Sequence, residues 1–316
     1  MAKVLVCGSN YGRVYIEALK LTGSRHTLAG ILARGSPRSR EVARKEGVRL
    51  YRTVSELPSD IELACVAVGS SAIEVVFELL KRGIPVLCEH PLKAGDVCRA
   101  LKLAQAAGTV FNVNGHFADL ETVAPFHRTC RQLGENQPVI AIDLMVVDRS
   151  LYGGLDIVRR SLHSSTPFEF RRNGKSGPFE RLAGTIGGTP ITVSVQTSGV
   201  RTDSSLEDGS PEYLTDIRVC MIYQSGILTL LSIAGPVIWN RNYIRFAAER
   251  GFMCDLLSPF EISGSDLSRM RIQANLRAVG RIFEQVQSAR IAPGQQPQEL
   301  MEVAELWETV GGLLRR

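Results

Sequence analysis

The stretch Lys3-Val-Leu-Val-Cys-Gly8-Ser-Asn-Tyr-Gly12-Arg13 decides the fold of the first third of this chain. A short apolar run leads into a turn with two glycines, and the residues that follow have helical spacing. This order is typical of sites where a pyrophosphate binds at a helix N-terminus. The complete G-x-G-x-x-G fingerprint would also need glycine at positions 10 and 13, where this chain has Asn10 and Arg13. The turn alone leaves open whether it binds a nucleotide or only joins a strand to a helix.

Apolar runs alternate with amphipathic stretches up to about residue 125. Strands that are apolar throughout are buried on both faces of a parallel sheet, so the pattern predicts a doubly wound α/β domain of the Rossmann type. From residue 138 onward the runs are β-branched and alternating, with glycine turns at Gly187-Gly188 and Gly226, and two amphipathic helices close the chain. We therefore predict an α/β nucleotide-binding domain over 1–124 and an α+β domain with a mostly antiparallel sheet over 125–316, with a mobile loop at 201–212.

Composition excludes several classes of protein. A length of 316 residues suits two domains, and 44% hydrophobic with 22% charged residues is typical of a globular chain. No apolar run is long enough for a membrane span and no export signal is visible, so we expect a cytoplasmic protein without membrane contact. The net charge of +5 includes no block of like charges, which disfavours nucleic acid as a partner. Seven dispersed cysteines without a CxxC pair predict neither disulfides nor a zinc site, and we expect no bound metal.

The end of the second predicted strand indicates which nucleotide binds. NAD-binding domains usually carry an acidic residue about 20 residues after the glycine turn, but this chain has Leu32-Ala-Arg34-Gly35-Ser36-Pro-Arg38-Ser39. Arginine and serine side chains can bind a 2′-phosphate, so the sequence favours NADP(H) over NAD(H). A solvated basic loop is the alternative. The residues expected to hold the cofactor in these two segments are Gly8, Ser9, Asn10, Tyr11, Gly12, Arg13, Arg34, Gly35, Ser36, Arg38 and Ser39.

A third motif, Cys88-Glu89-His90-Pro91-Leu92, stands at the end of a predicted strand. Together with the glycine turn it makes the chain resemble the glucose–fructose oxidoreductase (Gfo/Idh/MocA) family, whose members carry an E-K-P motif there. Histidine in place of the lysine is similar to the thiazolinyl imine reductase branch of that family, as are the A-R-G-S-x-R-S loop and the V-A-V-G-S-S strand end. The resemblance covers residues 3–125 and adds further expected cofactor contacts at Gly69, Ser70, Glu89, Pro91 and Asn114.

The resemblance implies NADPH-dependent reduction of a thiazoline C=N bond to a thiazolidine. The substrate would be a siderophore intermediate attached to a carrier domain of a nonribosomal peptide synthetase. The ring nitrogen needs a proton, and histidine is suited to give it because its reference pKa is about 6.5. His90 is therefore the first candidate for the acid, and binding of the ribose or orientation of the substrate is its alternative role.

The branch also carries a tyrosine, a proposed proton donor, in an N-T-F-Y-P-H segment after the fifth strand. The corresponding residues here are Asn114-Gly115-His116-Phe117-Ala118-Asp119, and Phe117 stands at the tyrosine position. Phenylalanine cannot donate a proton, so we consider His116 and Asp119 as substitutes, singly or as a pair. Either could equally be a surface residue at the edge of the sheet.

In the second domain, Tyr152 and Asp156 are four residues apart and can share a helix face, so we consider both as substrate contacts. We also expect a homodimer formed through the antiparallel sheet, as the resemblance implies. Two other functions stay open. One is a sugar or polyol oxidoreductase with the same fold, against which His90 counts, and the other is a non-catalytic NADP-binding partner, which Phe117 favours.

Overall fold

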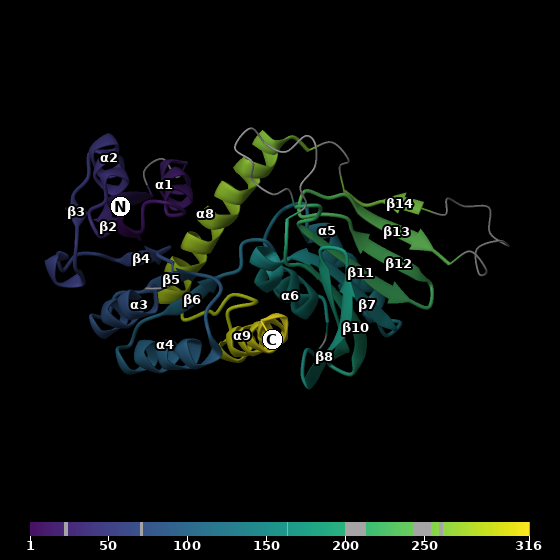
Figure 1. The fold of residues 1–316 in the computed structure, drawn as a ribbon. Helices are drawn as coiled ribbons and strands as arrows, with labels where there is room; N and C mark the ends of the chain where they lie inside the picture. The colour runs from purple at the N-terminus through teal and green to yellow at the C-terminus, as the bar shows by residue number, and fades with distance from the viewer. Residues whose placement is uncertain are drawn as a thin grey trace. The chain divides into compact units, whose positions relative to one another are not determined.

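The computed structural model describes residues 1–21, 25–69, 72–162, 164–199, 213–242, 254–258 and 262–315. They form two compact units (Figure 1). Unit 1 comprises Met1–His116 and Ser268–Ala304, and unit 2 comprises Phe117–Leu267 and Glu305–Arg316. The loop predicted at 201–212 lies outside the described residues.

Unit 1 contains a six-stranded sheet in which every pair of strands is parallel, in the order β3-β2-β1-β4-β5-β6. This order reverses between β1 and β4, and nucleotides bind at such a switch point. The predicted Rossmann sheet is confirmed. Its strands are β1 (Ala2–Cys7), β2 (His26–Leu32), β3 (Leu50–Tyr51), β4 (Leu63–Val66), β5 (Val86–Glu89) and β6 (Phe111–Asn114). Its crossover helices are α1 (Arg13–Lys20), α2 (Pro37–Glu46), α3 (Ala72–Lys81) and α4 (Ala94–Ala106), with a 3-10 turn, η1 (Val54–Glu56).

A helix from the far end of the chain completes unit 1. In α8 (Gly264–Ser288), Ala278, Val279 and Ile282 are buried in the same core as strands β1 and β4. Polar contacts hold α8 as well, because the Asn112 amide of β6 donates to Gln285 at 3.1 Å. The single boundary expected at 124/125 therefore differs from the observed division, in which the chain leaves unit 1 after residue 116 and returns at residue 268. The last helix is α9 (Pro297–Leu314).

Unit 2 contains an eight-stranded sheet in the order β14-β13-β12-β11-β7-β10-β9-β8. All neighbours are antiparallel except β7 and β10, so the expected mostly antiparallel sheet is confirmed. The strands are β7 (Ala141–Val147), β8 (Phe168–Ser176), β9 (Phe179–Ile186), β10 (Thr189–Gln196), β11 (Ile217–Tyr223), β12 (Gly226–Leu230), β13 (Val237–Arg241) and β14 (Cys254–Leu256). The helices are α5 (Ala124–Gly134) and α6 (Leu151–Arg160), the second preceded by the 3-10 turn η2 (Asp148–Ser150).

One face of this sheet is covered by α5, which packs on β12, and by α6, which packs on β7 and β11. Two glycines let α6 approach closely. A Cβ atom at Gly154 would lie 3.1 Å from Leu144 Cδ1, and one at Gly153 would lie 2.5 Å from the Phe117 ring. None of the described helices is long and apolar enough to cross a membrane.

Candidate functional site

The glycine turn has the geometry that a nucleotide needs. Gly8 has φ +101°, and a Cβ atom there would lie 2.5 Å from the Ala67 carbonyl oxygen at the end of β4. A Cβ atom at Gly12 would lie 2.1 Å from the Gly8 carbonyl oxygen. Both positions therefore require glycine, although the fingerprint is incomplete. Because α1 begins at Arg13, the positive end of its dipole lies beside this turn.

A cavity of about 910 Å³ opens at this turn, within unit 1. It is large enough for a dinucleotide to lie along its lining, and the space left by the glycines fits the approach of a pyrophosphate. The residues lining it come from the ends of β1, β2, β3 and β4 and from α3. They are Cys7, Gly8, Ser9, Asn10, Leu32, Ala33, Arg34, Ser36, Arg38, Arg52, Thr53, Val54, Ser55, Ala67, Val68, Gly69, Val75 and Glu78.

The cavity contains some of the predicted cofactor residues and not others. Those that line it are Gly8, Ser9, Asn10, Arg34, Ser36, Arg38 and Gly69. Those outside the lining are Tyr11, Gly12, Arg13, Gly35, Ser39, Glu89, Pro91 and Asn114. Ser70 lies outside the described residues. Sequence reasoning missed the lining residues Arg52–Ser55, because the two-residue strand that precedes them gives no recognisable pattern.

Ser39 has a structural task instead of the predicted phosphate contact. It is buried in the first turn of α2, where its hydroxyl donates to the Ser36 carbonyl at 2.9 Å and its N–H donates to the Ser36 hydroxyl at 3.2 Å. Ser36 is thus the N-cap of α2. This arrangement fixes the junction between the loop that carries Arg34 and the first turn of α2, which carries Arg38.

At the ends of β5 and β6, Glu89, His90 and Asn114 form a buried polar cluster. Asn114 pairs with Glu89 in the register of the two strands, and its amide donates to Glu89 Oε1 at 2.6 Å. The Tyr15 hydroxyl of α1 also donates to Glu89 Oε1. His90 Nδ1 lies 2.6 Å from the Asn114 carbonyl oxygen. Because a carbonyl only accepts, Nδ1 carries the hydrogen and Nε2 is the atom that can exchange a proton.

Burial raises the pKa of Glu89 to about 7, although the hydrogen bonds from Tyr15 and Asn114 favour the charged form. Its side chain is 14% exposed, and its Oε2 lies 3.9 Å from His90 Nδ1. Near neutral pH this carboxyl is therefore poised between its two protonation states. The Asn114 amide also lies 2.6 Å from Oδ1 of Asn275 in α8, so the helix that returns late in the chain supports the cluster.

His116 lies beside His90, with ring centroids 5.7 Å apart, and its Nε2 is 3.3 Å from the Tyr11 hydroxyl. Burial lowers the pKa of His116 well below the usual value, and the nearby charges of His90 and Arg271 lower it further. At neutral pH the ring is uncharged, which disfavours the predicted role as proton donor. Ligand-type atoms of Glu89, His90 and His116 lie within 4.8 Å of one another, but Glu89 and His90 are already engaged with Tyr15 and Asn114.

The other predicted chemical residues belong to an ion-pair network inside unit 2. Asp156 on α6 is 2% exposed, and its carboxylate accepts from Arg159 at 3.2 Å and from Arg160 at 2.9 Å. Burial raises the pKa of Asp156, but the two guanidinium groups outweigh it and hold the pKa below its usual value. Asp119, predicted as a proton donor, accepts from Arg160 at 3.1 Å. Both carboxylates therefore serve the packing of α6, and Tyr152 on the same helix is 3% exposed.

Phe117 has a structural explanation. It is 8% exposed and packs against the bare backbone of Gly153 on α6. A hydroxyl group is not needed for this contact, since the ring fills the space left by the glycine.

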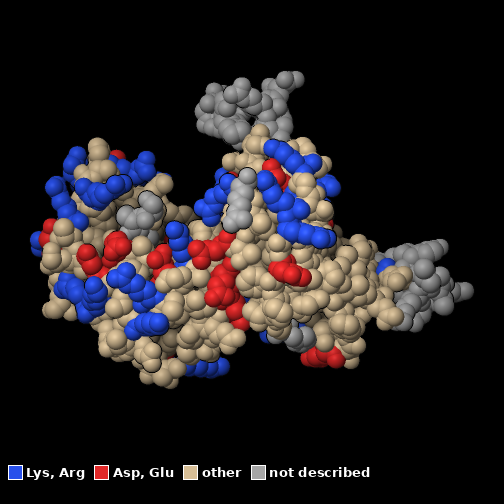
Figure 2. All heavy atoms as spheres, turned by 60° about the horizontal axis from the view of Figure 1, so that its bottom comes forward, with Lys and Arg blue, Asp and Glu red and all other residues tan. Residues whose placement is uncertain are grey.

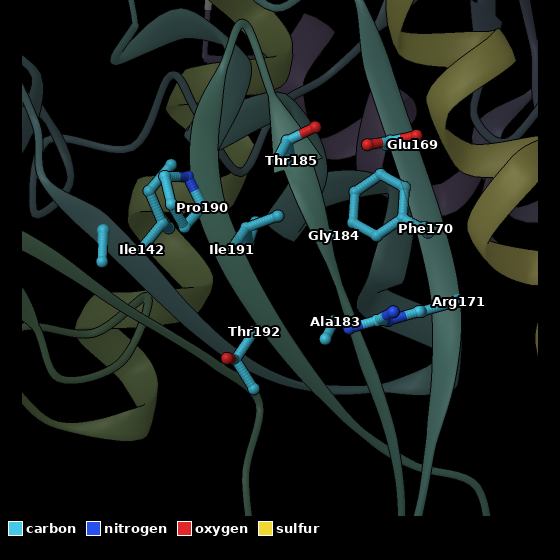
Figure 3. Close-up of a pocket in the computed structure, with 11 residues that line it drawn as sticks. Ile142, Glu169, Phe170, Arg171, Ala183, Gly184, Thr185, Pro190, Ile191 and Thr192 are labelled. Carbon is cyan, nitrogen blue, oxygen red and sulfur yellow. The ribbon is translucent and has the colours of Figure 1, made fainter.

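A second cavity, of about 470 Å³, lies in unit 2 over β7–β10 (Figure 3). Its polar side chains are those of Glu169, Arg171, Thr185 and Thr192. Along β9 and β10 the next residues, Leu182 and Val193, pair with each other and point to the opposite face of the sheet, where both are fully buried. Val193 also pairs with Leu144, which lies against α6. The cavity is therefore a groove on the face of the sheet that α5 and α6 leave uncovered.

The parallel sheet, its switch point and the cavity beside the glycine turn define a Rossmann domain of the kind that binds NAD(P). Comparison with known families agrees. Residues 2–115 match the model of the Gfo/Idh/MocA oxidoreductase family, NAD-binding Rossmann fold. A search of curated proteins finds no significant match to the chain.

Solved structures share the fold along the whole chain at low identity. One is an oxidoreductase from Agrobacterium radiobacter in complex with NAD+, L-tartaric acid and magnesium, with 14% identity, TM-score 0.73, and 99% of this chain and 96% of that chain covered. Another is UDP-N-acetylglucosamine 3-dehydrogenase from Acidithiobacillus ferrooxidans, with 14% identity, TM-score 0.72, and 98% and 97% covered. A third, a 3-ketoreductase from Actinomadura kijaniata in complex with NADP, has the same identity, TM-score and coverage as the second.

Proposed function

We propose that the chain is an NADP(H)-dependent oxidoreductase that interconverts a carbonyl and a hydroxyl group on a sugar or polyol. The family of the nucleotide-binding domain and the activities of the structural neighbours support this substrate class. The basic loop at Arg34 and Arg38, without an acidic residue at the end of β2, supports the phosphorylated cofactor. The observation that carries the proposal is the nucleotide cavity beside the glycine turn, in a domain that matches an oxidoreductase family. His90, which counted against a sugar substrate when only the sequence was considered, can exchange a proton through Nε2 with a hydroxyl group as well as with a ring nitrogen.

In this proposal, the bound cofactor supplies or accepts the hydride at its nicotinamide ring. The glycine turn and the start of α1 bind its pyrophosphate, and the loop after β2 binds its ribose phosphate. The Asn114 carbonyl holds the His90 ring with Nε2 as the atom that exchanges a proton with the substrate. Glu89, with its pKa of about 7, lies close enough to stabilise the protonated ring.

A specific observation favours a second candidate. The motif Glu89-His90-Pro91-Leu92 is similar to that of thiazolinyl imine reductases, in which the carbon that accepts hydride belongs to a C=N bond. The same His90 would then protonate the ring nitrogen of a carrier-bound thiazoline from a nonribosomal peptide assembly line.

One assay separates these functions. NADPH consumption is followed by absorbance with a panel of keto-sugars, free and nucleotide-linked, and with a synthetic thiazoline thioester, and NADP+ reduction is followed with sugars and polyols. Turnover of the sugars or polyols supports the first function, and formation of a thiazolidine supports the second. Tight NADPH binding with no turnover of any compound would contradict both and favour a non-catalytic binding partner.

We also propose a homodimer in which the uncovered face of the eight-stranded sheet contacts a second copy. Two large apolar side chains are exposed on this face, Ile227 at 39% and Leu256 at 54%, and Leu231, which directly follows β12, is 46% exposed. Their neighbours Leu228 and Leu230, which point to the helices, are fully buried. A second copy would remove these side chains from water.

A further inference from the structure

The arginines of the cofactor cavity come from two adjacent segments. The first follows β2 and carries Arg34, with Arg38 just beyond it in the first turn of α2, and the second is the loop that follows β3 and begins at Arg52. The strands are parallel neighbours with Leu32 paired to Tyr51, and Ala33 N–H donates to the Tyr51 carbonyl at 3.0 Å. The two loops therefore leave the sheet side by side.

The Arg52 side chain lies against the first loop. Gly35, between Arg34 and Ser36, has φ +83°, and a Cβ atom there would lie 3.3 Å from Arg52 Nε and 3.5 Å from Arg52 Cζ. The guanidinium group thus packs over the bare backbone of Gly35, within the segment that carries the other cationic and hydroxyl groups of this part of the cavity. The backbone conformation favours glycine at this position.

The second loop is held in place by its own contacts. The Arg52 N–H donates to Glu56 Oε2 at 2.9 Å, so this carboxylate engages the backbone of Arg52 and not its guanidinium group. The Arg82 side chain donates to the carbonyls of Val54 and Leu57, the second at 3.0 Å. Because these contacts already order the loop, less conformational entropy is lost when the Arg52 guanidinium group binds an anion.

The cationic groups have no anionic partner in the part of the chain that the structure describes. Neither Arg34, Arg38 nor Arg52 forms an ion pair there, and the one acidic residue in the cavity lining is Glu78. Residues 34–52 contain seven basic and two acidic residues. Figure 2 shows lysine and arginine side chains gathered at the left end of the view, the end at which Figure 1 draws α2 and β3.

We infer that Arg52 is a third arginine of the 2′-phosphate site and, with Arg34 and Arg38, determines the preference for the phosphorylated cofactor. The inference rests on the proposed use of NADP(H). A phosphate offers three acceptor oxygens, which three guanidinium groups, from the two adjacent loops and the first turn of α2, can bind together. The start of α2, capped by Ser36, adds the positive end of a helix dipole to the same segment.

The experiment measures binding of two cofactor fragments, adenosine 2′,5′-bisphosphate and 5′-AMP, by isothermal titration calorimetry. These fragments differ only in the 2′-phosphate and need no catalysis. Arg52→Ala should weaken the bisphosphate roughly 10-fold to 100-fold, the effect of one lost charge-assisted hydrogen bond, and should change 5′-AMP by less than about 3-fold. The affinity of Arg52→Lys for the bisphosphate should lie between those of the wild type and Arg52→Ala, because lysine keeps the charge but cannot form the bidentate contact of a guanidinium group.

Arg49→Ala is the matched control. Arg49 directly precedes β3, as Arg52 directly follows it, but its guanidinium carbon lies over the Tyr51 ring, 5.1 Å from the centroid, and the residue does not line the cavity. The substitution removes the same charge and should leave the ratio of the two dissociation constants unchanged. The double variant Arg34→Ala with Arg52→Ala should show a non-additive effect, as expected for two groups that bind one phosphate.

Two failures are distinguishable. If the wild-type chain binds both fragments equally, the proposed NADP(H) preference is wrong. If it prefers the bisphosphate and Arg52→Ala weakens both fragments equally, or neither, Arg52 has no part in phosphate recognition and the inference is overturned.

Discussion

A histidine at position 90 changes the chemistry available at the end of β5. A lysine side chain has a reference pKa of about 10 and stays charged at neutral pH, whereas histidine has a reference pKa of about 6.5. The Asn114 carbonyl fixes which ring nitrogen holds hydrogen, so the orientation of His90 is set by the backbone of β6. This orientation could not be inferred from the sequence, which identified the residue but not its partner.

His90→Ala should lower kcat by about 10²–10⁴-fold, because general acid catalysis contributes that much. The dissociation constant of NADPH should change by less than about 3-fold, since no phosphate contact is lost. Steady-state kinetics and fluorescence titration measure the two quantities. His26→Ala is the control, because His26 lies at the start of β2 and stacks on Phe283. An unchanged kcat in His90→Ala would remove this residue from the reaction.

Glu89 should make the protein less stable as the pH rises. Its pKa is raised from 4.5 to about 7 in the folded state, so between these values the folded state binds more protons than the unfolded state. The free energy of unfolding should therefore fall by up to about 3 kcal/mol as the pH rises through this window. Glu89→Gln, which keeps the acceptor for Tyr15 and Asn114, should abolish this contribution.

Urea denaturation of both proteins at pH 4.5, 6 and 8 measures it. The free energy of unfolding of the variant, relative to that of the wild type, should increase at each higher pH. A constant difference across the three pH values would mean that Glu89 titrates near its ordinary pKa in the folded protein.

Helix α6 was expected to present Tyr152 and Asp156 to a substrate, and the structure instead gives its charged residues a structural task. Arg159 and Arg160 follow Asp156 by three and four residues, the spacing at which helix side chains meet, so the pairs could have been found from the sequence. The partner Asp119 could not, because it lies 41 residues away.

Asp156→Ala should lower the free energy of unfolding by about 3–5 kcal/mol, because it removes the buried carboxylate that the guanidinium groups of Arg159 and Arg160 share. Chemical denaturation measures the change. Asp255→Ala, which removes a half-exposed partner of Arg241, is the control and should cost no more than about 1 kcal/mol. A variant of Asp156 with normal stability and a raised KM would restore the predicted substrate contact.

The strands that can be predicted from the sequence are those whose side chains are buried. The apolar runs of β1, β4 and β5 were found because they are buried on both faces. Strands β8 and β9 are not predicted from the sequence. Seven of the nine residues of β8 are exposed and four of these are charged, so its apolar alternation is too short to indicate a strand. Gln295 could not be predicted at all. Its amide bonds both the N–H and the C=O of Val113 on the edge strand β6, across 182 residues of sequence.

For the molecule as a whole, the uncovered face of the eight-stranded sheet predicts the oligomeric state. We expect a particle of twice the chain mass of 34.6 kDa by light scattering. Ile227→Lys together with Leu231→Lys should produce the monomer, because two charges would be buried without partners at the interface. Val286→Lys, at a site 50% exposed on α8, should leave the dimer intact. A wild-type monomer at micromolar concentration would contradict the proposal.

The return of α8 to unit 1 also has a consequence for how the protein is made. The ribosome releases β1–β6 long before residues Ala278, Val279 and Ile282, which complete the same core. At 5–20 residues per second, the interval between residues 116 and 282 is roughly 10–30 s. Throughout that time the nascent first sheet lacks part of its apolar cover and Asn114 lacks Asn275. The nucleotide-binding unit, although its sheet is translated before the eight-stranded sheet, therefore completes its folding only after α8 has been synthesised.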